Sequence, residues 1–204
     1  MEDARREMIC SLTRKLLKDF KGKPINSTML ENLYREKRYP KMISEIKNHM
    51  SIDCKLSVKC ITSAPLPGYE NTPAWIKLPR YFPAYKSPAQ RNMKLTMFYY
   101  KAEMDSYYKF VMLISHELAH LFLSSVNHSL RGSEEATDIC AIVLGFGRFY
   151  ELGQTTFNSN GRTRLGYLSI DEIIYVLSIV EGENPTATPP SKKVNWFSKL
   201  FGNL

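Results

Sequence analysis

The sequence has few cysteines, and they form no recognisable pattern. Its 204 residues contain four, Cys10, Cys54, Cys60 and Cys140, without a CxxC pair. Structural zinc sites built from cysteine need such closely spaced pairs, and disulfide-stabilised folds need a higher cysteine density. Both classes are therefore excluded, and we expect four free thiols, as is typical of a reducing compartment.

The sequence also lacks an apolar run of the roughly twenty residues that a membrane-spanning helix needs. The best candidate, FVMLISHELAHLFLSS at residues 110–125, is interrupted by two histidines and a glutamate. The opening MEDARREMICSLTRKLL begins with acidic residues and has no uninterrupted apolar segment of the kind found in secretory signals. These features predict a cytoplasmic protein.

Acidic residues are the scarcer charged type. The chain has 28 lysines and arginines against 20 aspartates and glutamates, a formal charge of +8, which favours anionic partners. No zinc-finger, RNP-like or helix-turn-helix signature accompanies this charge, so we expect no sequence-specific nucleic-acid binding. With 44% hydrophobic and 24% charged residues, the composition is that of a packed protein, and we expect one domain over residues 1–180.

Hydrophobic periodicity predicts the first half of the fold. Apolar residues recur at helical spacing over 4–20 and again over 27–50, within the helical part expected for residues 1–50, with a break at Pro40. The period then becomes two, which predicts strands over 55–61, 73–79 and 94–100. The proline-rich residues 78–92 are expected to form a loop without regular structure.

The second half is predicted to be helical. Two longer helices are expected over 106–125 and 134–152, with Ser133 as an N-cap and Gly153 as a helix stop. A loop over 153–166 and a short helix over 169–182 follow. The order of helices, a few strands and then helices predicts the α+β class.

The polar residues inside the apolar run form the motif HExxH. His116 and His120 lie four residues apart, so on a helix both imidazoles project from one face and can bind one metal ion. Glu117 is adjacent and can accept a proton from a water at the metal. The spacing therefore predicts a metal site with a candidate general base.

A catalytic zinc site needs a third protein ligand and one open position. The next predicted helix begins with SEEATD, residues 133–138. This pattern resembles the gluzincins, the thermolysin-like enzymes in which a glutamate of an ExxxD motif is the third ligand and the aspartate supports a ligand histidine. The resemblance implies Glu134 as a ligand and Asp138 as the supporting residue. Glu135 is the alternative third ligand.

The resemblance extends from HELAH to the Gly-Phe pair at residues 145–146. This stretch is similar in plan to the compact cores of HtpX-type and ImmA/IrrE-type proteins, and it implies a zincin-like fold, one zinc ion and peptidase activity. A metzincin would need a third histidine at the position of Val126, so that class is excluded.

Peptide hydrolysis requires two further features. The oxyanion needs a donor, for which Tyr150, Tyr167 and His128 are the candidates, although His128 also suits a plain surface turn. In the zincin fold the peptide substrate lies along an edge strand beside the HExxH helix. Either 73–79 or 94–100 would have to supply that edge.

Two other interpretations of the cluster remain open. The histidines can be buried and paired with Glu134 and Asp138 without a metal. Alternatively, a zincin-like core can bind zinc without catalysis and serve as a regulatory or scaffold protein. A scaffold has no use for a base beside an open metal position, so Glu117 favours the enzyme.

The C-terminal residues differ in composition from the domain. Residues 181–193 include NPTATPP and resemble a linker, and residues 194–204, VNWFSKLFGNL, combine aromatic, apolar and basic side chains. Such a tail predicts contact with a membrane surface, where the protein would be peripheral, or with a protein partner. It can equally fold back on its own domain.

Overall fold

A helical N-terminal region precedes the sheet. The computed structural model describes residues 2–62, 72–159 and 166–182. Helix α1 (Asp3–Asp19) is followed by α2 (Ser27–Arg35) and α3 (Tyr39–His49). Pro40 lies in the first turn of α3, where its missing N–H costs no hydrogen bond. The predicted break between the second and third helices is confirmed.

Within the described residues the sheet consists of β1 (Lys55–Ile61), β2 (Ala74–Ile76) and β3 (Lys94–Tyr100). Their order is β1-β3-β2, with β3 parallel to β1 and antiparallel to β2. Strand β3 is therefore central, so it does not supply the edge beside the HExxH helix. That position belongs to β2, which packs against this helix.

The proline-rich segment between β2 and β3 is more regular than predicted. It contains a short helix, α4 (Pro88–Asn92), in which the Ser87 hydroxyl accepts a hydrogen bond from Gln90 N. The loop prediction for residues 78–92 was wrong here because serine followed by proline is a helix start, with proline at the first helical position.

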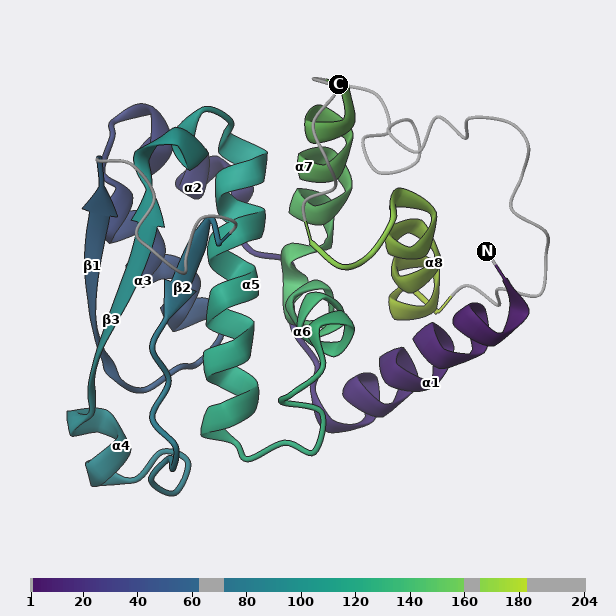
Figure 1. Ribbon diagram of the computed structural model, residues 1–204, viewed down its shortest axis with the longest axis horizontal. Helices are drawn as coiled ribbons and strands as arrows, with labels where there is room; N and C mark the ends of the chain where they lie inside the picture. Colours follow the sequence, from purple (N-terminus) through teal and green to yellow (C-terminus); the bar gives the residue numbers. More distant parts are fainter. Residues whose placement is uncertain (1, 63–71, 160–165, 183–204) are drawn as a thin grey trace.

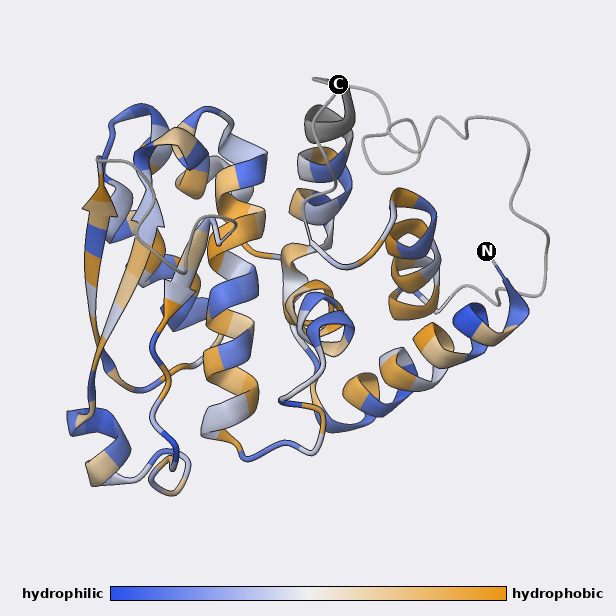
Figure 2. Cartoon of the chain, viewed as in Figure 1, coloured by the Kyte–Doolittle hydropathy of each residue, from blue (hydrophilic) through white to orange (hydrophobic). Residues whose placement is uncertain are grey.

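The HExxH helix is the central element of the molecule. After the 3-10 turn η1 (Lys101–Met104), helix α5 (Tyr107–Ser125) lies between the sheet on one side and α6 and α7 on the other (Figure 1). Orange, hydrophobic segments alternate with blue ones along the side of α5 seen in Figure 2. Mixed helix and strand with a small sheet confirm the α+β class.

The helix predicted over 134–152 is interrupted. The chain forms α6 (Glu134–Ala141), a π-helical turn η2 (Ile142–Phe146) and α7 (Gly147–Ser159). Gly145 has φ of 102°, and a Cβ there would clash with the carbonyl oxygen of Lys23. The segment joining α1 to α2 thus crosses the helix at this point, and this tertiary contact forces the kink.

Gly153 lies inside α7 and does not stop it, so the prediction of a loop over 153–166 was wrong for its first part. A Cβ on Gly153 would lie 3.2 Å from the Met112 sulfur and from the Tyr108 carbonyl oxygen. The glycine therefore permits close packing of α7 on α5. Helix α8 (Ile170–Val180) begins with a capping box between Ser169 and Glu172.

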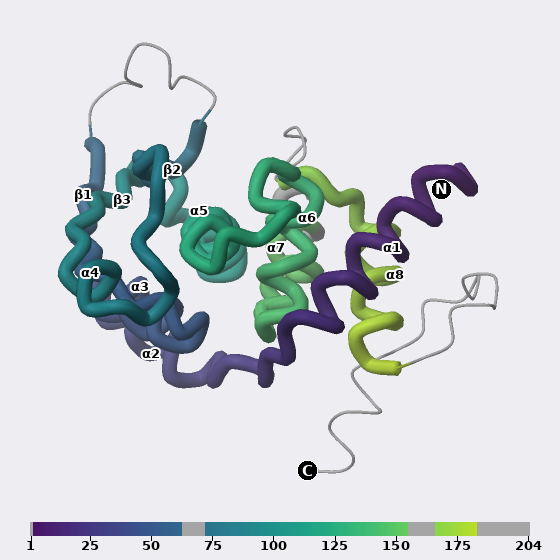
Figure 3. Tube along the Cα trace, turned by 90° about the horizontal axis from the view of Figure 1, so that it is seen from below, coloured from purple at the N-terminus to yellow at the C-terminus, as the bar shows by residue number. Residues whose placement is uncertain are grey.

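Helix α1 lies against the C-terminal half of the domain. It crosses α6 and α8 and packs against both (Figure 3). The four cysteines are free, as predicted. No helix among the described residues is long and apolar enough to cross a membrane. The predicted tail, residues 194–204, and all but the first two residues of the predicted linker lie outside the described residues.

Substitution of Gly145 tests the kink. Gly145→Ala should lower the free energy of unfolding by about 2 kcal/mol or more, because a Cβ would be strained at positive φ and would clash with the Lys23 carbonyl. Urea unfolding measures the difference. Gly132→Ala is the matched control, since no atom lies within 4 Å of its added Cβ, and it should change stability by less than about 0.5 kcal/mol. Equal effects of the two substitutions would contradict the proposed strain.

Candidate metal centre

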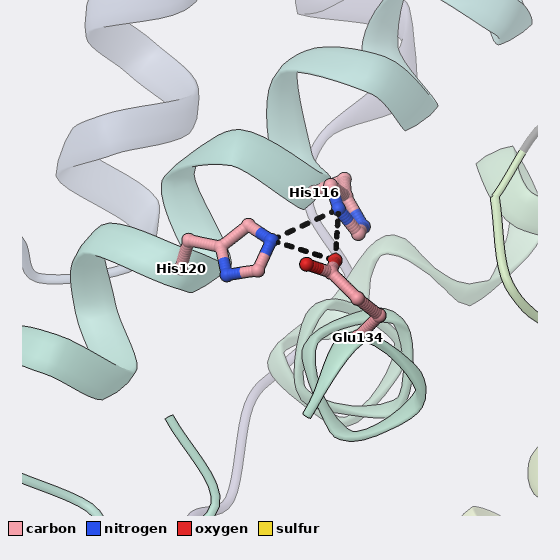
Figure 4. Close-up of side chains that lie close together, drawn as sticks. All are labelled: His116, His120 and Glu134. Carbon is pink, nitrogen blue, oxygen red and sulfur yellow. Dashed lines mark hydrogen bonds and ion pairs between the residues drawn. The ribbon is translucent and has the colours of Figure 1, made fainter. Parts of the chain in front are cut away.

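Three side chains from two helices converge beside the sheet. His116 and His120 project from one face of α5, and Glu134 reaches them from the first turn of α6 (Figure 4). His120 Nε2 lies 3.1 Å from His116 Nε2 and 2.9 Å from Glu134 Oε2. The remaining pair, His116 Nε2 and Glu134 Oε2, is separated by 3.3 Å. Each residue thus offers one potential ligand atom to a common point.

These separations fit a tetrahedral metal site. Ligands at about 2.0 to 2.1 Å from an ion lie roughly 3.3 Å from one another in a tetrahedron, close to the three measured distances of 3.1, 2.9 and 3.3 Å. Two imidazole nitrogens and a carboxylate oxygen form a donor set common to zinc and other divalent transition metals. The triad His116, His120 and Glu134 can therefore hold a divalent metal ion.

Both imidazoles are oriented by hydrogen bonds at their other nitrogen. His116 Nδ1 donates to Asp138 Oδ1 at 2.7 Å. The Thr137 hydroxyl donates to the Ser133 carbonyl, so its oxygen accepts from His120 Nδ1, at 3.3 Å. With Nδ1 as the donor, the Nε2 lone pair of each ring is directed at the common point, the tautomer that metal binding requires.

Asp138 is fully buried and binds more than a histidine. Its second oxygen, Oδ2, accepts from the backbone N–H of Tyr167 at 2.7 Å and of Leu168 at 3.3 Å. A Cβ on Gly166 would lie 3.1 Å from that oxygen. One buried carboxylate therefore orients His116 and fixes the segment that carries Tyr167.

The electrostatics of the triad require a positive charge between the rings. Burial opposes protonation of His116, but the charge and the hydrogen bond of Asp138 favour it, and with Glu134 they raise the pKa of His116 to about 10. Burial and the charge of His116 lower the pKa of His120. The hydrogen bond from His116 lowers the pKa of Glu134. The raised pKa of His116 favours a proton on this ring when no metal is bound, and a metal ion would replace that proton.

Glu117 lies beside the triad without joining it. Burial raises the pKa of its carboxyl to about 7, against the opposing charge of His116 and a hydrogen bond from the backbone of Ile76. Because a main-chain bond that favours the carboxylate must be donated, the Ile76 N–H points at Glu117. Glu117 is thus oriented by β2 and titrates near neutrality.

The two candidate third ligands differ in their partners. Glu134 Oε2 faces both histidines, whereas Glu135 Oε1 accepts from Arg5 Nη1 at 3.0 Å. The hydrogen bond with Arg5 lowers the pKa of Glu135, and Ser133 binds its other oxygen. The geometry therefore favours Glu134 as the ligand.

The three candidate oxyanion donors lie in different places. Tyr150 is fully buried next to Asp138, and burial raises its pKa, so it has no access to a substrate. His128 Nε2 lies 3.1 Å from Asp19 Oδ2, and its Nδ1 accepts from Leu130 N in the turn after α5. Only the ring of Tyr167 stacks on His116, with ring centroids 5.8 Å apart and planes inclined by 17°.

Sequence reasoning missed three residues of the site, Thr137, Ile76 and Arg5. Thr137 has a local signal, because it follows Glu134 by three positions on the same helix and so shares its face. Ile76 acts through its backbone N–H, which any residue other than proline provides. Arg5 lies 130 residues from Glu135 in the sequence, so no local pattern could reveal it.

Comparison with known proteins finds no relative of this chain. The chain matches no family model, no curated protein and no solved structure. The description of the centre thus rests on its own geometry.

Substitution of the two adjacent glutamates tests the identity of the third ligand. Glu134→Ala should weaken metal binding by more than the roughly 10- to 100-fold that loss of a supporting residue costs, because it removes a ligand. Glu135→Ala should weaken it by less than about tenfold, since its carboxylate faces Arg5. Competition with a chromophoric chelator measures both dissociation constants. Equal losses, or loss only in Glu135→Ala, would contradict the assignment.

Metal binding should release a proton from His116. With a raised pKa of about 10, this imidazole is protonated at pH 8 and must lose its proton to bind a metal, so affinity should rise with pH until about pH 10. Calorimetry at pH 8 in buffers of different ionisation enthalpy should therefore detect about one released proton per ion. Asp138→Asn should lower the His116 pKa and reduce that number. An unchanged proton count in Asp138→Asn would refute this account.

Proposed function

We propose that the protein is a zinc-dependent peptidase with a zincin-like core. The observation that carries this proposal is the convergence of His116, His120 and Glu134 on one point, with Glu117 beside them and outside the triad. The HExxH and ExxxD spacings of the gluzincins would produce this arrangement. The sequence resemblance and the side-chain geometry thus support the same interpretation.

Zinc is the metal we propose, because imidazole and carboxylate ligands in a tetrahedral arrangement suit it and three protein ligands leave a fourth position open. When bound, such an ion would polarise a substrate carbonyl and lower the pKa of a water molecule towards neutrality. The remaining steps depend on residues of the chain.

Glu117 is the proposed general base and then the general acid. A carboxyl with a pKa of about 7 can both accept a proton from water and return it to the leaving amine at neutral pH. That value describes the metal-free centre, in which His116 is protonated. The hydrogen bond from the Ile76 N–H keeps the carboxylate beside the triad without a direct role in metal binding.

Tyr167 is the proposed donor to the oxyanion. Its pKa is raised, first by burial and then by the surrounding carboxylates Glu134 and Asp138, so the phenol stays protonated at neutral pH and can donate. The side chain is 47% exposed, unlike Tyr150. A substrate can therefore reach it.

The substrate we propose is an extended peptide along β2. Tyr100 N donates to the Pro73 carbonyl, and hydrogen-bonded pairs alternate along an antiparallel ladder. With Ile76 opposite Met97, the Ile76 N–H then points away from β3, on the side of Glu117. A peptide that pairs with this edge would place its backbone next to the proposed base.

Substitution of Glu117 tests the catalytic part separately from metal binding. Glu117→Gln should keep the bound zinc and the melting temperature yet abolish hydrolysis of any peptide that the parent cleaves, because the amide cannot accept the proton. A proteome-derived peptide library analysed by mass spectrometry reports cleavage. Glu135→Gln is the matched control and should retain activity. If Glu117→Gln cleaves as well as the parent, the mechanism is wrong, and a parent that cleaves nothing would favour the scaffold alternative.

A further inference from the structure

Arg5, in the first turns of α1, contacts three parts of the chain that surround the candidate metal centre. Its guanidinium donates from Nη1 to Glu135 Oε1 at 3.0 Å and from Nε to Glu172 Oε1 at 2.8 Å. Its Nη2 lies 3.4 Å from the Tyr167 carbonyl oxygen. One side chain therefore joins α6, α8 and the segment between α7 and α8.

Two of the three partners of Arg5, Glu135 and Tyr167, lie next to candidate metal ligands. Glu135 is the neighbour of Glu134 on α6. Tyr167 stacks on His116 through its ring and binds Asp138 through its N–H. The Tyr167 segment is thus held from two sides, by Asp138 at its amides and by Arg5 at a carbonyl.

Glu172 also restrains the Tyr167 segment. Its Oε1 accepts from Arg5, and its Oε2 accepts from the backbone N–H of Ser169 at 2.7 Å. Its side chain is only 7% exposed, and Arg5 forms an ion pair with it there. Removal of Arg5 would leave two carboxylates, those of Glu135 and Glu172, without this counter-charge beside a cation site.

Glu135 has room to move if Arg5 does not hold it. An open hollow of about 610 Å³ lies beside Glu135, and it is lined by Arg5, Glu135, Gly166, Tyr167, Ser169 and Glu172. The Glu135 side chain is 30% exposed, so packing does not fix it. A carboxylate released into this space would be attracted by a divalent ion bound to Glu134 and the histidines.

We propose that Arg5 is a positioning residue of the metal centre, which holds Glu135 away from the ion and the Tyr167 segment against His116, so that Glu134 alone completes the triad. The inference rests on the proposed metal binding but not on catalysis. This proposal gives α1, which lies outside residues 116–146, a defined role at the site. Arginine suits this role because its planar fork binds two carboxylates and a carbonyl at once, which a lysine ammonium does not.

Cobalt-loaded protein tests the proposal, because Co²⁺ absorbs strongly in the visible range with four ligands and weakly with five or six. Arg5→Gln should lose visible intensity relative to the parent, since the freed Glu135 carboxylate adds a ligand. Arg5→Gln combined with Glu135→Gln should regain the parent spectrum, and Glu135→Gln alone should resemble the parent. A purely structural role of Arg5 predicts no such rescue.

Circular dichroism shows which variants fold, and Arg5→Lys is included in case Arg5→Gln does not. This conservative variant keeps the charge without the fork, and it should lose part of the intensity. A parent-like spectrum in the folded Arg5 variants, or a loss that persists when Glu135 is also replaced, would overturn the proposal. A parent that binds no cobalt would overturn both the metal centre and the role of Arg5. A parent that binds cobalt but cleaves no peptide would overturn only the catalysis.

Discussion

The hydrogen bond between His116 and the fully buried Asp138, 2.7 Å long, is the interaction on which the rest of the centre depends. A carboxylate buried without partners would cost several kcal/mol, and here it binds an imidazole and two backbone amides. The same bond sets the tautomer of His116 and holds α6 against α5. The contact that joins α6 to α5 is thus also the one that orients His116.

The surrounding fold places α5 and α6 so that the bond between His116 and Asp138 can form. Helix α5 lies between the sheet and the C-terminal helices (Figure 1), and its two histidines face the first turn of α6. The turn at Gly145 separates α6 from α7, and both helices pack against α5. Helix α1 then covers α6 and α8 and brings the Arg5 guanidinium to the carboxylates of Glu135 and Glu172.

The residues of the site form an inner level and an outer level. The inner level consists of residues that would touch a metal ion or a substrate, His116, His120, Glu134, Glu117 and Tyr167. The outer level consists of Asp138, Thr137 and Arg5, which restrict the conformations of the inner residues. This division explains how two adjacent glutamates with the same chemistry have different environments: one faces two imidazoles and the other a guanidinium.

The sequence by itself determined most of the order of helices and strands, the cap at Ser133, and the approach of His116 and His120 to a glutamate at the start of the next helix, because these follow from local periodicity and fixed spacings. It failed where distant segments meet. The kink at Gly145 arises from the Lys23 carbonyl, and the helical state of Gly153 from the close approach of α5.

Only the tertiary structure separated Glu134 from Glu135 and Tyr167 from Tyr150. Neighbours in the sequence carry the same local signal, so their roles were set by what lies opposite them: Arg5 from the first helix, the buried surroundings of Tyr150, and the Ile76 N–H of an edge strand. Contacts across so long a sequence separation depend on the packing of the whole domain, which no local pattern encodes.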